Sequence, residues 1–144
     1  MSPVLKGHFA DYAAFHRTPG NQACHSLGIP LIVLSGFGLL SQVTLLRLGG
    51  YGVSPAELLL LAACLYYLAL DAGLALLMSL ASGVLLLVGR QLPWGLDLGL
   101  FVLGWILQFV GHYAYEKRSP AFFKNLTHLL VGPLWILAKA TGRA

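Results

Sequence analysis

Long stretches without a charged residue are the feature that most constrains the fold of this chain. Residues 27–46 contain no Lys, Arg, Asp or Glu, and residues 98–115 form a second such run. Between them, residues 58–89 carry a single charge, Asp71. A helix of about 20 apolar residues is long enough to cross the ~30 Å hydrocarbon core of a bilayer. These runs predict a polytopic membrane protein built from helices.

The composition excludes most classes of soluble protein. Lys, Arg, Asp and Glu make up 10% of the 144 residues, whereas soluble domains contain about 25%. Two cysteines, Cys24 and Cys64, are too few for a disulfide scaffold. The nine Lys and Arg are dispersed along the chain, unlike the basic stripe of a nucleic-acid-binding protein. We therefore expect one membrane-embedded domain over residues 1–144 and no nucleic-acid partner.

Helix-breaking residues divide the apolar runs into spans. Gly49-Gly50 is expected to end the first span, and Ser54-Pro55-Ala56-Glu57 predicts the start of the next helix. Residues 58–89 are too many for one span and few for two, so we interpret them as a tight helical hairpin that turns at residues 71–73. The last apolar run, 126–138, is too short to cross and is expected to be interfacial or re-entrant. The predicted fold is an all-α bundle of about four transmembrane helices with short interfacial helices at both ends.

The basic residues predict the orientation in the membrane. With four spans, the side that holds both termini carries Lys6, Arg17, Lys117, Arg118, Lys124, Lys139 and Arg143. The opposite side carries only Arg47 and Arg90, and three spans would give a weaker asymmetry. The positive-inside rule then places both termini in the cytoplasm. The short chain fits a bacterial inner membrane, although an endoplasmic reticulum protein would look the same.

Four of the five histidines come from segments at the predicted cytoplasmic ends of the first and last full spans: His16, His25, His112 and His128. An imidazole in an apolar chain is costly unless it is hydrogen-bonded or bound to a metal. Polar residues at membrane depth are functional candidates by default. We therefore expect these side chains to share a site.

The local spacings support this convergence. His16 and His25 would point in opposite directions on an unbroken helix, but Thr18-Pro19-Gly20 predicts a helix start between them. Asn21 then lies on the same helix face as His25, four residues earlier.

A second polar stripe lies near the end of the last full span. Gln108, His112 and Glu116 repeat at intervals of four residues, which places them on one face of a helix. Simpler interpretations exist for two of them. Gln108 could only bridge two helices by a hydrogen bond, and Glu116 could be an ordinary interfacial charge beside Lys117 and Arg118.

Imidazole ligands, with or without a carboxylate, suit zinc, iron, copper or nickel. Two histidines and one carboxylate are the ligand set of non-haem Fe(II) oxygenases, and His112 and Glu116 with His16 or His25 could supply it. Spacing alone does not choose between iron and zinc. A zinc-dependent membrane lipid hydrolase and a non-enzymatic haem-binding or lipid-binding module therefore stay open as alternatives.

Two motifs in the sequence resemble those of the yeast-type 2-hydroxy fatty acid dioxygenases. The first comprises Phe15-His16, Asn21, His25 and Gly28-Ile29-Pro30. The second runs from Trp105 to His112 and continues through Glu116-Lys117-Arg118, Pro120-Ala121, Asn125-Leu126 and Gly132-Pro133. The resemblance covers both ends of the chain, whereas the middle hairpin is similar only in being apolar.

This resemblance implies an integral membrane dioxygenase that uses Fe(II) and O₂. Members of that family shorten 2-hydroxy fatty acids by one carbon through α-oxidation, in the breakdown of phytosphingosine. The expected partners are a 2-hydroxy fatty acid, O₂ and the lipid bilayer.

The resemblance also implies roles for individual residues. His16, His25 and His112 would hold the iron, and His128 is a candidate fourth ligand. The catalytic candidates that would support these ligands are Asn21, Gln108 and Glu116, with Glu116 also a candidate ligand. Lys117 or Arg118 would pair with the substrate carboxylate.

Overall fold

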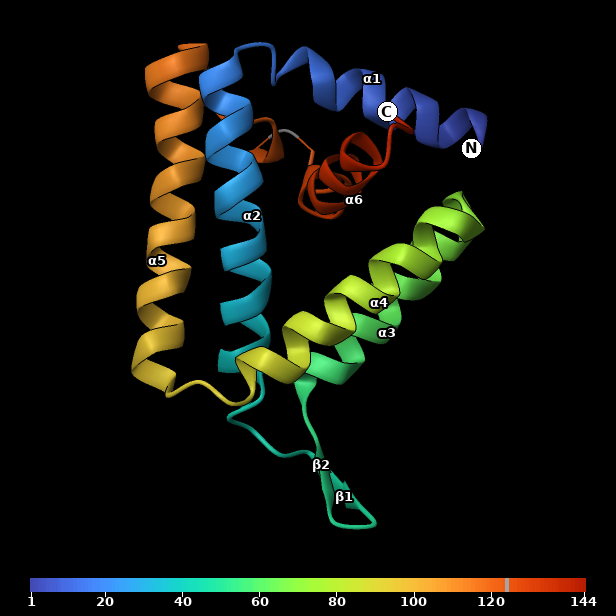
Figure 1. Cartoon of the computed structure of the whole chain (residues 1–144), viewed down its shortest axis with the longest axis vertical. Coiled ribbons are helices and arrows are strands. Elements are labelled where there is room, and N and C mark those ends of the chain that lie inside the picture. Colours follow the sequence, from blue (N-terminus) through green and yellow to red (C-terminus); the bar gives the residue numbers. More distant parts are fainter. Residues whose placement is uncertain (124) are drawn as a thin grey trace.

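The computed structural model describes residues 1–123 and 125–144, whose regular secondary structure is helical apart from one short β-hairpin (Figure 1). In chain order the elements are α1 (Pro3–Ala14), α2 (Pro19–Leu40), β1 (Leu46–Leu48), β2 (Tyr51–Val53), α3 (Pro55–Leu70), α4 (Ala72–Gly89), α5 (Trp94–Val110), the π-helix η1 (Gly111–Glu116), the 3₁₀-helix η2 (Ala121–Phe123) and α6 (His128–Ala140).

Short polar side chains begin several of these helices. The hydroxyl of Thr18 accepts a hydrogen bond from the N–H of Asn21 at the start of α2, and Ser54 with Glu57 forms a capping box at the start of α3. Asp71 ends α3 and caps α4 by accepting from the N–H of Leu74. These caps satisfy N–H groups that have no partner within the helix. They confirm the predicted helix starts at Thr18 and Ser54 and the predicted turn at Asp71.

The expected end of the first span is wrong. The helix covers Pro19–Leu40 and not residues 27–46, because its cap at Thr18 starts it earlier and its backbone turns away after Ser41. Gly49 and Gly50 form the turn of the hairpin between β1 and β2, with φ angles of 53° and 87°. Positive φ at both central residues is typical of a two-residue hairpin turn and strongly favours glycine. The glycine pair therefore reverses the direction of the chain within a β-hairpin and does not end a helix.

The two longest helical segments, α2 and α5 with η1, run side by side (Figure 1). Their backbones approach closely at Gly28 and Gly104: a Cβ atom on Gly104 would lie only 2.9 Å from the carbonyl oxygen of Gly28. Close contact through small residues is common between membrane helices. This packing brings the start of α2 and the end of α5 together at one end of the molecule, from which α1 extends away from the pair and passes above α6 (Figure 1).

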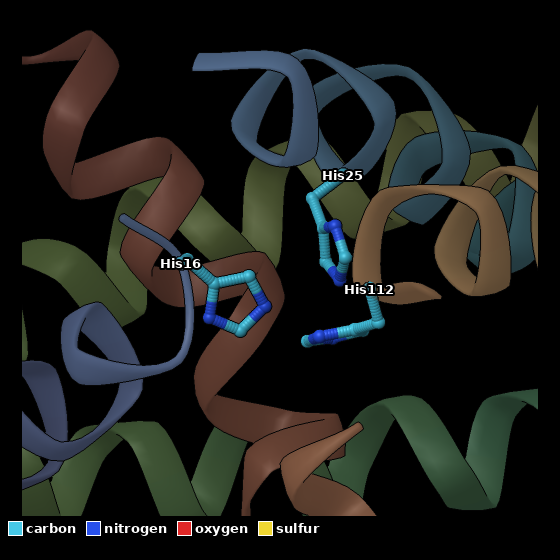
Figure 2. A group of neighbouring side chains, drawn as sticks. All are labelled: His16, His25 and His112. Carbon is cyan, nitrogen blue, oxygen red and sulfur yellow. The ribbon is translucent and has the colours of Figure 1, made fainter. Parts of the chain in front are cut away.

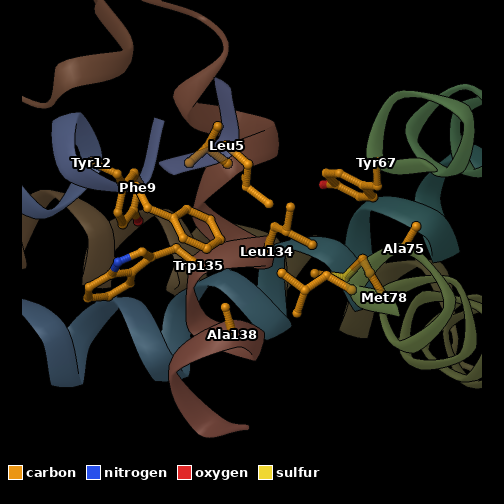
Figure 3. Packing of buried hydrophobic residues seen from close by; sticks show 11 residues of the cluster. Leu5, Phe9, Tyr12, Tyr67, Ala75, Met78, Leu134, Trp135 and Ala138 are labelled. Atoms are coloured by element: carbon orange, nitrogen blue, oxygen red, sulfur yellow. The ribbon is translucent and has the colours of Figure 1, made fainter. Parts of the chain in front are cut away.

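The helices α3 and α4 form an antiparallel hairpin that leans away from this pair (Figure 1). Its turn reaches the region of the termini, where Asp71 lies 2.9 Å from the amino group of Met1 and 3.9 Å from Arg143. The largest hydrophobic cluster fills the space between α1, α6 and this hairpin (Figure 3). Its buried members are Leu5, Phe9, Tyr12, Tyr67, Leu74, Ala75, Met78, Val131, Leu134, Trp135 and Ala138.

Three helical segments of the described chain are long and apolar enough to cross a membrane: Pro19–Leu40, Ala72–Gly89 and Trp94–Glu116. The helices α3 and α6 are apolar but shorter. Many leucines on the outer faces are exposed, including Leu61, Leu80 and Leu87, and large exposed apolar surfaces mark contact with membranes or partners. The fold is thus helical with three candidate spans, and a fourth crossing stays a prediction.

Candidate metal centre

Three of the four predicted histidines converge. His16 comes from the segment between α1 and α2, His25 from α2, and His112 from η1, and their rings lie together in Figure 2. One ligand atom from each lies within 4.8 Å of the other two. The ring centroids are 4.4 to 4.9 Å apart, and all three residues are buried.

Backbone hydrogen bonds decide which ring nitrogen carries the proton in two of these histidines. The Nδ1 of His16 lies 2.7 Å from the carbonyl oxygen of Tyr12, and the Nδ1 of His25 lies 3.0 Å from that of Asn21. A carbonyl oxygen only accepts hydrogen bonds, so each Nδ1 carries a proton. In the neutral ring, the lone pair on Nε2 is then available to a metal.

Two nitrogens of the group are left without partners. The Nε2 of His16 and the Nδ1 of His112 are buried, and neither has a hydrogen-bond partner among residues 1–123 and 125–144. A buried polar atom without a partner costs free energy, which a bound metal ion would recover. These orphaned nitrogens and the mutual approach of the rings fit a metal ion held by histidines.

Burial keeps His16 neutral. Removal from water lowers the pKa of this imidazole to about 4, and the nearby ring of His112 lowers it too, against the hydrogen bond to Tyr12. The neutral imidazole is the form that binds metals. His16 is therefore in its ligating form throughout the physiological pH range.

A π-helix carries His112 into the site. Its six residues, Gly111–Glu116, have a wider turn than an α-helix, and such segments often occur at functional sites. A Cβ atom on Gly111 would lie 2.4 Å from Oδ1 of Asn21 and 3.2 Å from Nδ1 of His25. The absence of a side chain at Gly111 therefore lets η1 approach α2 closely enough to join His112 to His25.

The predicted stripe of Gln108, His112 and Glu116 crosses the boundary between α5 and η1, so its members do not all face the same place. Oε1 of Glu116 accepts hydrogen bonds from the backbone N–H of Thr18 at 2.6 Å and from its hydroxyl at 3.1 Å. Glu116 thus ties the end of η1 to the start of α2 and lies outside the group of three histidines.

Asn21 supports the site from within α2. Its side-chain amide donates to the carbonyl oxygen of Phe15 at 3.2 Å, and its own carbonyl holds His25. Two supporting residues were missed by the sequence analysis. Tyr12 stacks on His16 with ring centroids 3.9 Å apart, and the side chain of Gln22 donates to the carbonyl oxygen of His16 at 2.7 Å. The four-residue spacing between Tyr12 and His16 is a signal that could have identified the first.

A pocket of about 190 Å³ lies beside the three histidines, and Gln108 and His128 also line it. The remaining wall is mostly apolar, from α2, α5, η2 and α6. The Nε2 of Gln108 is buried without a partner in the described residues. The amide therefore has hydrogen-bond donors available to a ligand in this pocket.

His128 belongs to this pocket but not to the group of three. Its Nε2 lies 2.7 Å from Oδ2 of Asp11, an exposed residue that the sequence analysis did not single out. Its Nδ1 is buried and unpartnered within the described chain.

Lys117 and Arg118 lie outside the pocket lining. Both are exposed, Lys117 at a left-handed backbone position with φ 54°. Arg118 donates to the carbonyl oxygen of Ala14 at 3.4 Å, and its guanidinium carbon lies 4.9 Å from the centre of the Phe15 ring. Lys124, which the charge count also used, lies outside the described residues.

Comparison with known proteins identifies the family of the chain. The family model described as 2-hydroxy-palmitic acid dioxygenase Mpo1-like matches residues 3–144. The 2-hydroxy-palmitic acid dioxygenase MPO1 of Saccharomyces cerevisiae is 34% identical over 134 residues, which cover 92% of this chain and 77% of the yeast protein. No solved structure matches the chain. The chain belongs to the Mpo1-like family.

Proposed function

We propose that this protein is an Fe(II)-dependent dioxygenase that converts a 2-hydroxy fatty acid into the fatty acid one carbon shorter. The observation that carries the proposal is the buried group of His16, His25 and His112, which offers ligand atoms within 4.8 Å of one another in a chain whose relative is named for this activity. Three imidazoles suit iron but also zinc, so the metal must be tested directly.

The overall chemistry balances without a separate reductant. A 2-hydroxy acid and O₂ give the shortened acid, CO₂ and water, and the bond between carbons 1 and 2 breaks. Both of these carbons are oxidised, and together they supply all the electrons that reduce O₂. Bound Fe(II) would supply the activation of O₂ that this reaction needs.

The residues of the chain hold and orient the reactants. His16, His25 and His112 hold the metal, while the carbonyls of Tyr12 and Asn21 orient two of the three rings. The amide of Gln108 donates to the carboxylate or hydroxyl of the substrate, because it lines the pocket with an unpartnered donor.

The other candidate residues surround this centre. Glu116 keeps η1 attached to the start of α2. His128 stays a candidate fourth ligand, since it lines the same pocket and its buried Nδ1 has no hydrogen-bond partner among the described residues. Lys117 and Arg118 are exposed and are proposed to attract the carboxylate as it approaches.

We further propose that the protein crosses a membrane with the metal centre near its cytoplasmic face. The elements at the end of the molecule that carries the histidines are α1, η1 and α6 (Figure 1), and within or next to them in the chain lie Lys6, Arg17, Lys117, Arg118, Lys139 and Arg143. Arg47 in β1 and Arg90 at the end of α4 lie at the other end (Figure 1). This asymmetry supports a cytoplasmic site under the positive-inside rule.

The test is turnover by protein purified in detergent and loaded with Fe(II) under anaerobic conditions. After addition of a 2-hydroxy fatty acid and air, mass spectrometry should detect the acid one carbon shorter, with a matching loss of O₂. His112→Ala should lose iron and activity, whereas His8→Ala, on α1 outside the group of three histidines, should keep both. Turnover with zinc and without O₂, or a haem absorption band in the purified protein, would contradict the proposal.

A further inference from the structure

A second and larger cavity lies beside the metal centre. Its volume is about 620 Å³, within the range of roughly 300–1,000 Å³ that is usual for small-molecule sites. It lies between α2, the α3–α4 hairpin and α6, with Phe101 of α5 on one side. Almost all of its wall is apolar.

The two cavities adjoin one another and share part of their walls. Four residues line both of them, namely Ile32 and Val33 of α2 and Leu129 and Pro133 of α6. The histidine pocket and the larger cavity therefore meet at the junction formed by these four residues. A molecule that spans both would place one end beside the histidines and the other among leucines and phenylalanines.

Two of the polar side chains along the larger cavity, those of Tyr67 and Cys64, already have hydrogen-bond partners. The hydroxyl of Tyr67 donates to the carbonyl oxygen of Leu130 at 2.8 Å, and Cys64 accepts from the hydroxyl of Ser79 at 2.9 Å. These bonds leave little for water to bind, and apolar cavities tend to stay dry or take apolar ligands. The wall is thus suited to an alkyl chain.

We propose that the larger cavity holds the alkyl tail of the substrate while its 2-hydroxy carboxylate end lies in the histidine pocket. The proposal rests on the proposed function, because it assumes that a 2-hydroxy acid occupies the first pocket. The length of tail that fits is then set by the wall of the cavity beyond the junction.

Gly36 is a position where a substitution can move this wall inward. A Cβ atom there would meet only Cε2 of Phe101, at the ordinary contact distance of 3.8 Å, and both residues line the cavity. A longer side chain at Gly36 would therefore occupy space that the tail needs, without a collision with the backbone.

The experiment compares Gly36→Leu with the control Gly99→Leu. Gly99 is an exposed residue of α5, and a Cβ atom there would meet nothing within 4 Å. We expect Gly36→Leu to lose about tenfold or more in kcat/KM for a long-chain 2-hydroxy acid, because a filled hydrophobic pocket discriminates by chain length. Its kcat/KM for a short 2-hydroxy acid and its iron content should match those of Gly99→Leu.

A second variant that narrows the larger cavity keeps the proposal testable if Gly36→Leu fails to fold. Ser82→Leu enters the same cavity from α4, so it should shift the preference toward short acids in the same way. Equal losses for short and long acids in both variants, with iron content retained, would overturn the proposal.

A binding measurement separates this proposal from the proposed function. A 2-hydroxy acid with a photoreactive group at its methyl end should label cavity residues such as Met78 and Leu60, even in His112→Ala, which would have no turnover. If wild-type protein shows no turnover but this labelling occurs, the cavity proposal stands and the activity fails. If a phospholipid with the same group on its acyl chain labels Met78 equally and the 2-hydroxy acid does not displace it, the cavity holds bilayer lipid, which overturns the proposal.

Discussion

Single residues at the candidate metal centre are oriented mainly by the backbone. His16 and His25 each place Nδ1 against a carbonyl oxygen four residues earlier in the chain, which turns Nε2, on the other side of each ring, away from that carbonyl. Such bonds raise the basicity of a ligand and fix its direction. The ligand geometry therefore depends on the helical turns before each histidine, and substitutions that keep those turns should keep the site.

Gln108 offers a direct test of substrate contact. Its buried amide has no partner for Nε2 in the described chain and lines the histidine pocket. Gln108→Leu keeps the size of the side chain but removes the donor, which is worth about 1–3 kcal/mol when a buried group is left unpaired. We expect KM for the 2-hydroxy acid to rise about tenfold or more, with iron content unchanged. Loss of iron together with activity would instead show that Gln108 supports the ligands.

The sequence was most informative about individual side chains. His16, His25 and His112 could be predicted as a group, because a cap at Thr18 and the apolar surroundings already imply that they share one end of a bundle. The supporting role of Asn21 was expected, but the backbone contact through which Asn21 supports His25 was not. Its backbone carbonyl lies against Nδ1 of His25. Because every residue has a backbone carbonyl, the residue type gives no signal of such a contact.

Whole elements meet at the site through glycines. Gly28 and Gly104 allow α2 and α5 to touch, and Gly111 allows η1 to approach Asn21 and His25. In a membrane there is little hydrophobic drive for helices to associate, so close packing of this kind carries much of the attraction. The distance between His25 and His112 is thus set by three residues without side chains.

Gly104→Ala should weaken both the fold and the metal centre. A Cβ atom there would lie 2.6 Å from Cγ1 of Ile32 and 2.9 Å from the carbonyl oxygen of Gly28, so the two helices must move apart. Overpacking of this kind costs about 1–3 kcal/mol. We expect a lower melting temperature in detergent and weaker retention of iron. Gly99→Ala is the matched control, and an equal effect in that exposed variant would contradict the explanation.

The bounds of elements were harder to predict than their existence. The helix starts at Thr18 and Ser54 and the turn at Asp71 depend on local signals and could be predicted correctly. Gly49-Gly50 is consistent with either a helix end or a hairpin turn, and only the pairing of Leu48 with Tyr51 decides between them. The π-helix depends on contacts between η1 and α2. A regular repeat of polar residues predicts only an α-helix and gives no signal of such contacts.

Contacts at the turn of the α3–α4 hairpin join it to both ends of the chain. The N–H of Leu74 and the amino group of Met1 hold the pKa of Asp71 below its usual value. A carboxylate with a lowered pKa stabilises the folded state at pH values above its ordinary pKa, and this contribution is lost as the pH falls through the pKa of the folded state. The hairpin should therefore be held more weakly in acid.

Asp71→Asn isolates this charge, because asparagine caps a helix about as well as aspartate. We expect the free energy of unfolding to fall by about 0.5–1 kcal/mol at neutral pH, with the difference from wild type vanishing in acid. Asp71→Ala also removes the cap and should lose about 1 kcal/mol more at every pH. Denaturant unfolding in detergent across pH measures both. A deficit in Asp71→Asn that persists at low pH would exclude the charge as its cause.

The larger cavity is bordered by Leu59, Leu126 and Leu129, all of them exposed on the flank of the helices. A substrate that enters through this flank need not pass through water. Its effective concentration is therefore its mole fraction among the surrounding lipids. Diluting the acid with inert lipid at a fixed total amount should therefore slow turnover, whereas adding both in proportion should leave the rate per enzyme unchanged. The enzyme would then respond to the make-up of its membrane and not to how much membrane a cell contains.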